Sequence, residues 1–308
     1  MNRHTLKKTA VAAAIALAAS MGSAVSVSAA TATTPSTSSS TPGSKESLAT
    51  KRKLLEERQQ KVEHEAFEAI TGTQNALMAL QKKDTKKAMA LLQEVSGKLD
   101  ILLAKYPGLN LIPANVEADI YDFDGTSKQV EKLTDAADDL LEDHKVQDAR
   151  AILADLVSEM RITTTSIPLG TFPIAIKDAA SLIDKGKTAE AEDALYEVLS
   201  LLVKTTEIMP LPVLRAEVLL TKASELEHKS DLSKAASRTQ ILKLTDAAKE
   251  KLKLAEMLGY GDKKDYKLLY DSIDDLKDVI HSEKSAAAWD KVKNSLSAFK
   301  NKIIHVKK

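Results

Sequence analysis

The chain has 308 residues, of which 44% are hydrophobic and 4% aromatic, and it contains no cysteine. This apolar content is enough to bury a core in one large or two modest domains. The 44 basic and 44 acidic residues balance each other, so net charge points neither to nucleic acid nor to an anionic membrane as a partner. Without cysteine there are no disulfides, and the folded chain depends on its core for stability.

The first 29 residues have the pattern of a secretory signal peptide. Arg3, Lys7 and Lys8 precede an apolar run at 10–19, and small residues lead up to Ala29. We predict cleavage near Ala29 and export to a periplasm, with no membrane span, because a span needs about 20 apolar residues. The remaining chain has 41 basic and 44 acidic residues, and protonation of all its carboxylates and five histidines would bring it to +46.

Composition then changes twice along the chain. Residues 30–47 are rich in Thr, Ser and Pro and lack large apolar side chains, so we predict a flexible tether. From residue 48 onward, apolar residues recur at spacings of three, four and seven, as in helices that bury one face. We expect an all-α fold in two parts, with a bundle of antiparallel helical hairpins at 48–228 and a helical C-terminal region at 229–308.

Three of these hairpins share one spacing pattern. Counted from an alanine at zero, small or apolar residues recur at +3, +4, +12, +15 and +16, with a polar stretch in between. This is typical of a helix, a tight turn and an antiparallel helix. The copies are Ala76, Ala79, Leu80, Ala88, Leu91, Leu92; Ala137, Leu140, Leu141, Ala149, Ile152, Leu153; and Ala179, Leu182, Ile183, Ala191, Ala194, Leu195. Their starts lie 61 and 42 residues apart, so they form no solenoid of fixed period.

Three joints separate the hairpins, and they hold every proline beyond residue 48. They lie at 106–126, 161–173 and 208–212. We predict extended segments there, because proline cannot donate a hydrogen bond within a helix. The first joint ends in an Asp-Gly turn, after which Thr126 or Ser127 caps the next helix. No proline follows Pro212, so we predict long helices at 212–228, 231–257, 265–281 and 285–302.

One motif suggests catalysis. Residues 122–126 read D-F-D-G-T, the nucleophile motif of haloacid-dehalogenase-type phosphatases, where one carboxylate attacks phosphorus and the second handles the leaving-group proton. That motif follows a buried apolar strand, whereas Glu117 and Asp119 interrupt the residues that precede it here. A phosphatase acting through Asp122 and Asp124 is kept as an alternative, and a structural turn fits better.

The same stretch half-matches a calcium loop, with Asp122, Asp124 and Glu131 at ligand positions, but Ile120 occupies the first one. None of the five histidines beyond the signal peptide has a second histidine within three to five residues, which argues against zinc. No glycine-rich phosphate loop or nucleophile elbow is present. We therefore expect no metal, no cofactor and no catalytic residue.

The joint at 161–173 is the candidate interaction segment. Loops carry function more readily than helices, but β-branched apolar residues prefer to be covered, so we favour a structural joint over a binding loop. The side chains concerned are Ile162, Thr163, Ile167, Leu169 and Phe172.

Several stretches resemble the signature of the YfdX family. They are Arg161-Ile162-Thr163-Thr164, Pro168-Leu169, Thr171-Phe172-Pro173, Ala175-Ile176, Asp184-Lys185-Gly186-Lys187 and Ile208-Met209-Pro210-Leu211-Pro212. The resemblance extends from about Ala66 to Leu226.

The resemblance implies an exported, almost wholly helical protein that is prone to form homo-oligomers. It links the chain to bacterial tolerance of acid and heat, through chaperone-like binding of unfolded clients or contact with a small periplasmic chaperone. It implies no enzyme activity. The competing class is a structural or adaptor oligomer that binds one defined partner.

Overall fold

A computed structural model of the chain describes residues 42–307 except 232, 281 and 283. These residues belong to one compact unit, Ser40–Lys308. The predicted signal peptide, its cleavage position near Ala29 and residues 30–41 of the predicted tether lie outside the described residues.

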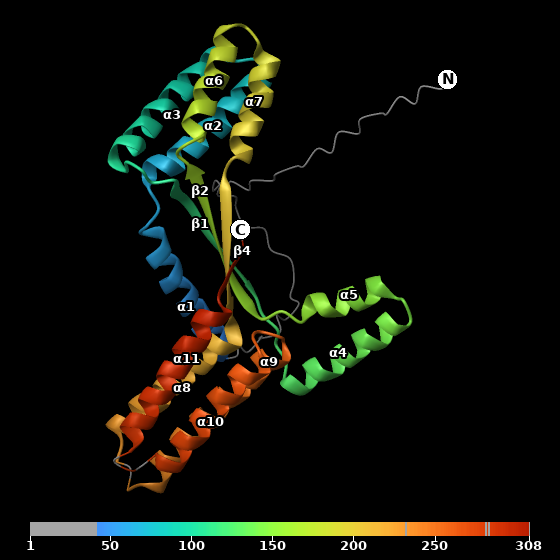
Figure 1. The fold of residues 1–308 in the computed structure, drawn as a ribbon, viewed down its shortest axis with the longest axis vertical. Coiled ribbons are helices and arrows are strands. Elements are labelled where there is room, and N and C mark those ends of the chain that lie inside the picture. The colour runs from blue at the N-terminus through green and yellow to red at the C-terminus, as the bar shows by residue number, and fades with distance from the viewer. Residues whose placement is uncertain (1–41, 232, 281, 283, 308) are drawn as a thin grey trace, which may run out of the picture. The chain divides into compact units, whose positions relative to one another are not determined.

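The prediction of a predominantly helical fold is confirmed, and the described residues form eleven helices and four strands (Figure 1). The helices are α1 (Pro42–Gln59), α2 (His64–Gln81), α3 (Thr85–Lys105), α4 (Ser127–Glu142), α5 (Val146–Asp155), α6 (Phe172–Asp184), α7 (Thr188–Ser200), α8 (Leu211–Lys229), α9 (Ala235–Met257), α10 (Lys263–Val279) and α11 (Ser285–Ile303). The strands are β1 (Leu111–Tyr121), β2 (Glu159–Pro168), β3 (Val203–Pro210) and β4 (His305–Lys307).

The three repeat copies fold into the hairpins α2–α3, α4–α5 and α6–α7, and their turns have one geometry. The residue at +7 has a positive φ in each copy, namely 62° at Lys83, 60° at His144 and 73° at Gly186. The next amide N–H donates to the carbonyl oxygen of the residue at +3, over 2.9, 2.8 and 2.9 Å. This hydrogen bond satisfies a carbonyl at the end of the first helix. The shared sequence spacing therefore corresponds to a shared structural unit.

The predicted joints are not only linkers, because strands lie in or overlap each of them and form one antiparallel sheet of order β1-β2-β3-β4. The third joint was placed too late, because β3 begins at Val203 and the prediction began at residue 208. In register, Glu117 faces Thr163, and Thr163 faces Thr206. Pro113 lies beside a register shift in the edge strand β1, and Pro210 ends β3, positions where a missing N–H is tolerated in a sheet. The sheet is the part of the fold that was not predicted.

The topology of the sheet decides which hairpins meet. Because β1, β2 and β3 are antiparallel neighbours, successive connections leave from opposite ends of the sheet. Hairpins α2–α3 and α6–α7 thus share one end, where α3 contacts α6 and α2 contacts α7. Hairpin α4–α5 leaves from the other end, where α4 contacts α9.

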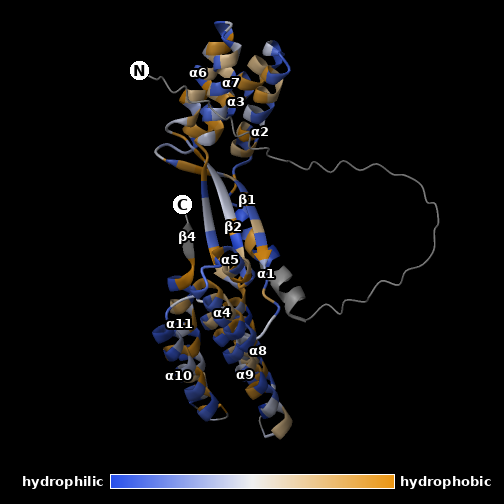
Figure 2. Ribbon diagram, turned by 90° about the vertical axis from the view of Figure 1, so that its right-hand side faces the viewer, coloured by the Kyte–Doolittle hydropathy of each residue, from blue (hydrophilic) through white to orange (hydrophobic). Residues whose placement is uncertain are grey.

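The buried apolar side chains form two cores between helices and a smaller core on the sheet. The first joins α2, α3, α6 and α7 with residues at one end of the sheet. The second joins α8, α9, α10 and α11, and includes Tyr266, Trp289 and Phe299. In the third, Leu54 and Leu55 of α1 pack against apolar side chains on one face of the sheet. Figure 2 shows hydrophilic and hydrophobic residues interspersed along the helices, which fits helices with one buried face.

The C-terminal helices were predicted within a few residues of their observed bounds. The predicted flexible tether at 30–47 needs a correction at its end, because α1 begins at Pro42 and residues 42–47 are helical. Proline suits the start of a helix, where its missing N–H would lack an intrahelical partner anyway. The division of the body at residues 228 and 229 stays a prediction, although α8 shares its core with α9, α10 and α11.

The turn geometry gives a first prediction. Replacing Lys83 or His144 by glycine should raise the free energy of unfolding by about 0.5–1 kcal/mol, because a side chain at positive φ is strained and glycine is not. Lys82→Gly is the control, because Lys82 has a φ of −86° and should gain nothing. Urea denaturation of the full chain measures the change. Equal effects at Lys82 and Lys83 would contradict this explanation.

Candidate interaction surfaces

The predicted interaction segment is largely covered. Ile162, Ile167, Leu169 and Phe172 are each less than 5% exposed, and the Thr163 hydroxyl lies 3.0 Å from that of Thr206 on the neighbouring strand. Their role in partner binding stays a prediction, and their burial favours the structural joint.

Strand alternation explains how one segment is buried so completely. Side chains five positions apart on a strand point to opposite faces of the sheet. Ile162 accordingly packs in the sheet core beneath α1, whereas Ile167 packs in the core of α2, α3, α6 and α7. Phe172 begins α6 and extends the same core. The segment thus anchors two cores at once.

Asp122 is held in an ion pair at the end of β1. Arg215 of α8 donates to both of its carboxylate oxygens, over 3.0 and 2.6 Å, and the Ser158 hydroxyl donates to Oδ1 over 3.1 Å. The Arg215 side chain is only 12% exposed. A carboxylate bound at both oxygens by a guanidinium is fixed in place and is less available as a nucleophile.

The contacts continue from Ser158 into a polar network at the start of β2. The Ser158 amide donates to the Tyr260 hydroxyl over 3.0 Å, and that hydroxyl donates to Glu159 over 2.8 Å. Arg161 Nε donates to the other Glu159 oxygen over 2.5 Å, and its guanidinium lies 4.3 Å from the centre of the Tyr121 ring. Burial raises the pKa of the Tyr260 phenol. The network joins β1, β2 and the turn between α9 and α10.

The catalytic and metal alternatives gain no support from this geometry. Asp124 is exposed, and Thr126 caps the start of α4 through a reciprocal side-chain contact with Gln129, as the turn interpretation predicted. Within the described ranges, no three or more His, Asp or Glu side chains are grouped so as to hold a metal ion. The expectation of no cofactor stays a prediction.

The histidines are dispersed among separate elements. His64 lies 3.3 Å from Glu68 at the start of α2, His144 lies in a hairpin turn, and the His228 ring lies 2.8 Å from the Ser224 carbonyl oxygen near the end of α8. His281 lies outside the described residues, and His305 is in β4. His64, His144 and His228 therefore lie in three separate parts of the fold.

A groove of about 490 Å³ lies between α8 and α11. Leu220, Trp289 and Leu296 are apolar residues in its lining. Beside them, Lys300 Nζ donates a hydrogen bond to Oε2 of the lining residue Glu217 over 2.6 Å. The Trp289 indole N–H donates to Glu227, a carboxylate that is only 6% exposed. The other lining residues are mostly polar or charged, namely Glu217, Thr221, Ser224, Glu225, His228, Asp290 and Lys293. This mixed lining could contact both apolar and polar side chains of a peptide.

Sequence reasoning missed this groove, although one signal was available. Trp289 is the single tryptophan of the chain, and tryptophan is enriched where apolar surface meets a polar group. Its helix was predicted, but which helix lies opposite depends on packing between distant segments. The Arg215 partner of Asp122 was missed for the same reason.

The described residues define a helical-hairpin protein built on a small antiparallel sheet. Residues 69–208, a little less than half of the chain, match the model of the family described as YfdX protein. This match supports the resemblance to the YfdX family over this part of the chain. The YfdX family is not a known enzyme family.

Other comparisons add little. A solved structure of the YfdX protein of Salmonella Typhi is similar at 17% identity, covering 49% of this chain and 93% of that one, with a TM-score of 0.35. No curated protein matches the chain. None of the helices in the described part of the chain has an apolar stretch sufficient to cross a lipid bilayer.

The burial of the interaction segment gives a second prediction. Ile167→Ala should lower the free energy of unfolding by about 2–4 kcal/mol, because it leaves a cavity in the place of a side chain that is fully covered. Ile174→Ala, on the neighbouring helix α6, is the control, because Ile174 is 61% exposed and its loss should change stability little. If Ile167→Ala kept wild-type stability and lost partner binding, the segment would be the binding site.

The Asp122 network gives a third prediction. Asp122→Asn should lower the free energy of unfolding by about 1–2 kcal/mol, because it leaves the largely covered Arg215 guanidinium facing a neutral amide. The exposed Asp124→Asn serves as control and should change stability little. Neither variant should differ from wild type in hydrolysis of p-nitrophenyl phosphate. A phosphatase activity that Asp122→Asn abolished would restore the catalytic alternative.

Proposed function

We propose that the chain is a non-enzymatic periplasmic stress-tolerance protein, active in acid or heat through chaperone-like binding of unfolded clients or of a small periplasmic chaperone. The proposal is supported by the match to the family model over residues 69–208, by what the resemblance implies, and by the N-terminal pattern that ends near Ala29. The absence of cysteine means that no disulfide holds the fold when conditions change.

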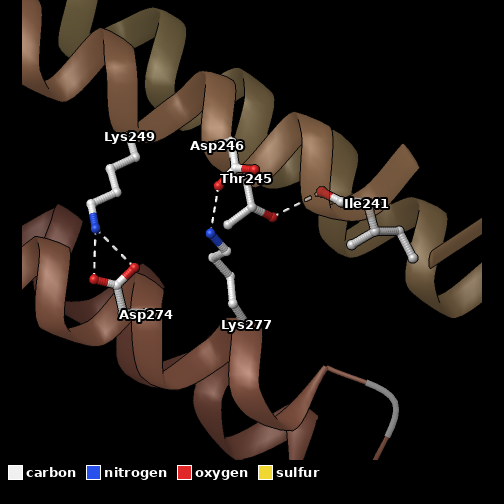
Figure 3. A network of polar contacts seen from close by, with 6 residues as sticks. All are labelled: Ile241, Thr245, Asp246, Lys249, Asp274 and Lys277. Carbon is white, nitrogen blue, oxygen red and sulfur yellow. Dashed lines mark hydrogen bonds and ion pairs between the residues drawn. The ribbon is translucent and has the colours of Figure 1, made fainter. Parts of the chain in front are cut away.

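The observation that carries the proposal is a set of lysine–carboxylate pairs between neighbouring helices. Between α9 and α10, Lys249 Nζ lies 2.6 Å from Asp274 Oδ2, and Lys277 Nζ lies 2.5 Å from Asp246 Oδ1 (Figure 3). Both aspartate side chains are more than half exposed to solvent.

The same chemistry joins the other helices of this core. Lys291 lies 2.7 Å from Asp275 between α11 and α10, and Lys300 lies 2.6 Å from Glu217 between α11 and α8. Exposed pairs of this kind are individually weak. All of them should respond to acid in the same way, however, because protonation of the carboxylate leaves the lysine charge without an opposite charge at each contact.

Two glutamates near the start of α2, Glu63 and Glu68, indicate how the stability of the fold should change with pH. Hydrogen bonds from Lys105 and Tyr106 hold the pKa of Glu63 below its usual value of 4.5, and a hydrogen bond from Lys98 does the same for Glu68. A pKa lowered by folding means that the pair stabilises the fold above the usual pKa. That contribution is lost as pH falls below about 4.5 through the lowered value.

Acid would then loosen the contacts between helices. With carboxylates neutral, the lysines that remain repel one another. The helices hold apolar faces against each other, and the α8–α11 groove already has apolar residues in its lining around Trp289. Partial opening would offer these faces to the apolar segments of unfolding proteins.

The alternative function is a structural or adaptor oligomer that binds one defined partner. Client breadth separates the two functions, because a chaperone-like protein should protect several unrelated denatured proteins from aggregation, whereas an adaptor should co-purify with one. The described surfaces fit both.

The proposal predicts a response to pH that Trp289 reports directly. Between pH 7 and pH 3, Trp289 emission should shift to longer wavelength, binding of an apolar dye should rise, and aggregation of denatured clients should fall. Asp246→Asn with Asp274→Asn mimics protonation of the α9–α10 pairs and should move the midpoint of these changes to higher pH.

Asp271→Asn is the matched control, because Asp271 is an exposed aspartate on the same helix α10 outside the pairs drawn in Figure 3. It should leave the midpoint unchanged. Dye binding and client protection that stay flat between pH 7 and pH 3 would refute the proposal.

A further inference from the structure

Hairpin α4–α5 exposes the positions that the other two hairpins bury. At +4 and +16 of the shared pattern, Leu80 and Leu92 are 2% and 0% exposed, and Ile183 and Leu195 are 8% and 0% exposed. All four lie in the core where α2–α3 packs against α6–α7. The matching residues of α4–α5 are Leu141 and Leu153, which are 42% and 44% exposed.

A third apolar side chain adds to this surface. At +9 the other hairpins have Thr85 and Thr188, whereas α4–α5 has Val146, which is 54% exposed. We call Leu141, Val146 and Leu153 the hairpin patch. Apolar residues are exposed elsewhere on the chain, but Leu141 and Leu153 hold the pattern positions that make a hairpin–hairpin contact in the other copies, and Val146 adds to them.

The sheet explains why the patch has no hairpin of this chain against it. Hairpins α2–α3 and α6–α7 leave from the same end of the sheet and cover each other, whereas α4–α5 leaves from the opposite end. There α4 contacts α9, and α5 packs on α4. The contact with α9 does not cover Leu141 or Leu153.

Charge indicates what kind of partner fits. The two hairpins that pack together differ in net charge, with six basic and five acidic residues in 64–105 and three basic and six acidic residues in 172–200. Hairpin α4–α5 has four basic and eight acidic residues in 127–155, a net charge of −4. A second copy of this hairpin would bring two such charges together, which opposes association at neutral pH.

We propose that the hairpin patch is a docking surface for a helical segment of another protein that carries a net positive charge. In this chain, α2–α3 packs against the acidic hairpin α6–α7. The partner would pack against the acidic hairpin α4–α5 in the same way, with its apolar residues on Leu141, Val146 and Leu153. Carboxylates beside the patch, such as Asp138 and Glu142, would face its basic residues. This is recognition of an amphipathic helix by its apolar face, with charge selecting the partner.

This inference rests on the proposed function only in so far as both make the chain a binding protein. It needs no acid, and acid should weaken it by protonating the carboxylates. The two proposals are therefore tested at different pH, and either can fail while the other stands.

The test uses the full chain at pH 7 and low salt with two fluorescein-labelled amphipathic peptides of about 18 residues, five helical turns. One is built of Leu and Lys and the other of Leu and Glu. The Leu/Lys peptide should bind and the Leu/Glu peptide should not, as measured by anisotropy. Leu141→Ser with Leu153→Ser should weaken binding about tenfold or more, and raised salt should weaken it further.

Leu103→Ser with Leu268→Ser is the matched control, because these leucines are exposed on α3 and α10. It should bind like wild type, and circular dichroism should show both variants folded. Equal binding by the patch variant and wild type, or equal loss in both variants, would overturn the proposal. It would also be overturned if sedimentation showed a wild-type dimer that the patch variant dissociates, because the occupant would then be a second copy.

Discussion

The pairing of β1, β2 and β3 is the constraint on which the arrangement of the helices depends. Each strand lies between two helical units, and antiparallel order sends successive units to opposite ends of the sheet. The first and third hairpins are thereby brought together, although more than 60 residues separate α3 from α6. The second hairpin is sent to the end where α8 begins. Contacts along the sheet thus decide which helix faces are covered.

Much of the helical structure follows from local sequence. Spacing of Ala and Leu predicted three hairpins, and the φ values at Lys83, His144 and Gly186 show that the repeat includes the turn. The sheet did not follow, because its first three strands contain proline, differ in apolar spacing, and pair residues that are at least 37 positions apart, as for Ser166 and Val203. Extended conformation is a local property, whereas pairing depends on the three joints meeting in space.

Asp122 illustrates why sequence alone was ambiguous about function. The letters D-F-D-G-T fit a nucleophile motif and also a turn before a helix cap, and both descriptions concern neighbours in sequence. What distinguishes them is Arg215, 93 positions away, whose guanidinium holds both oxygens of the carboxylate. The Ser158 and Tyr260 contacts extend this into a polar link between strands and C-terminal helices. The carboxylate of the apparent motif thus joins the end of β1 to the start of α8.

Charge has two separable consequences in this molecule. Lysine–carboxylate pairs between helices respond alike to acid, because protonation removes only the negative partner and the lysines stay charged. Hairpin α4–α5 has a net charge of −4 in residues 127–155, and its Leu141 and Leu153 are exposed. On our two proposals, the lysine–carboxylate pairs would make contacts within the chain depend on pH, and the acidic hairpin patch would favour basic partners. Falling pH would then weaken the binding of a basic helix to the hairpin patch. It would also loosen the interhelical pairs and so expose apolar helix faces to unfolded proteins.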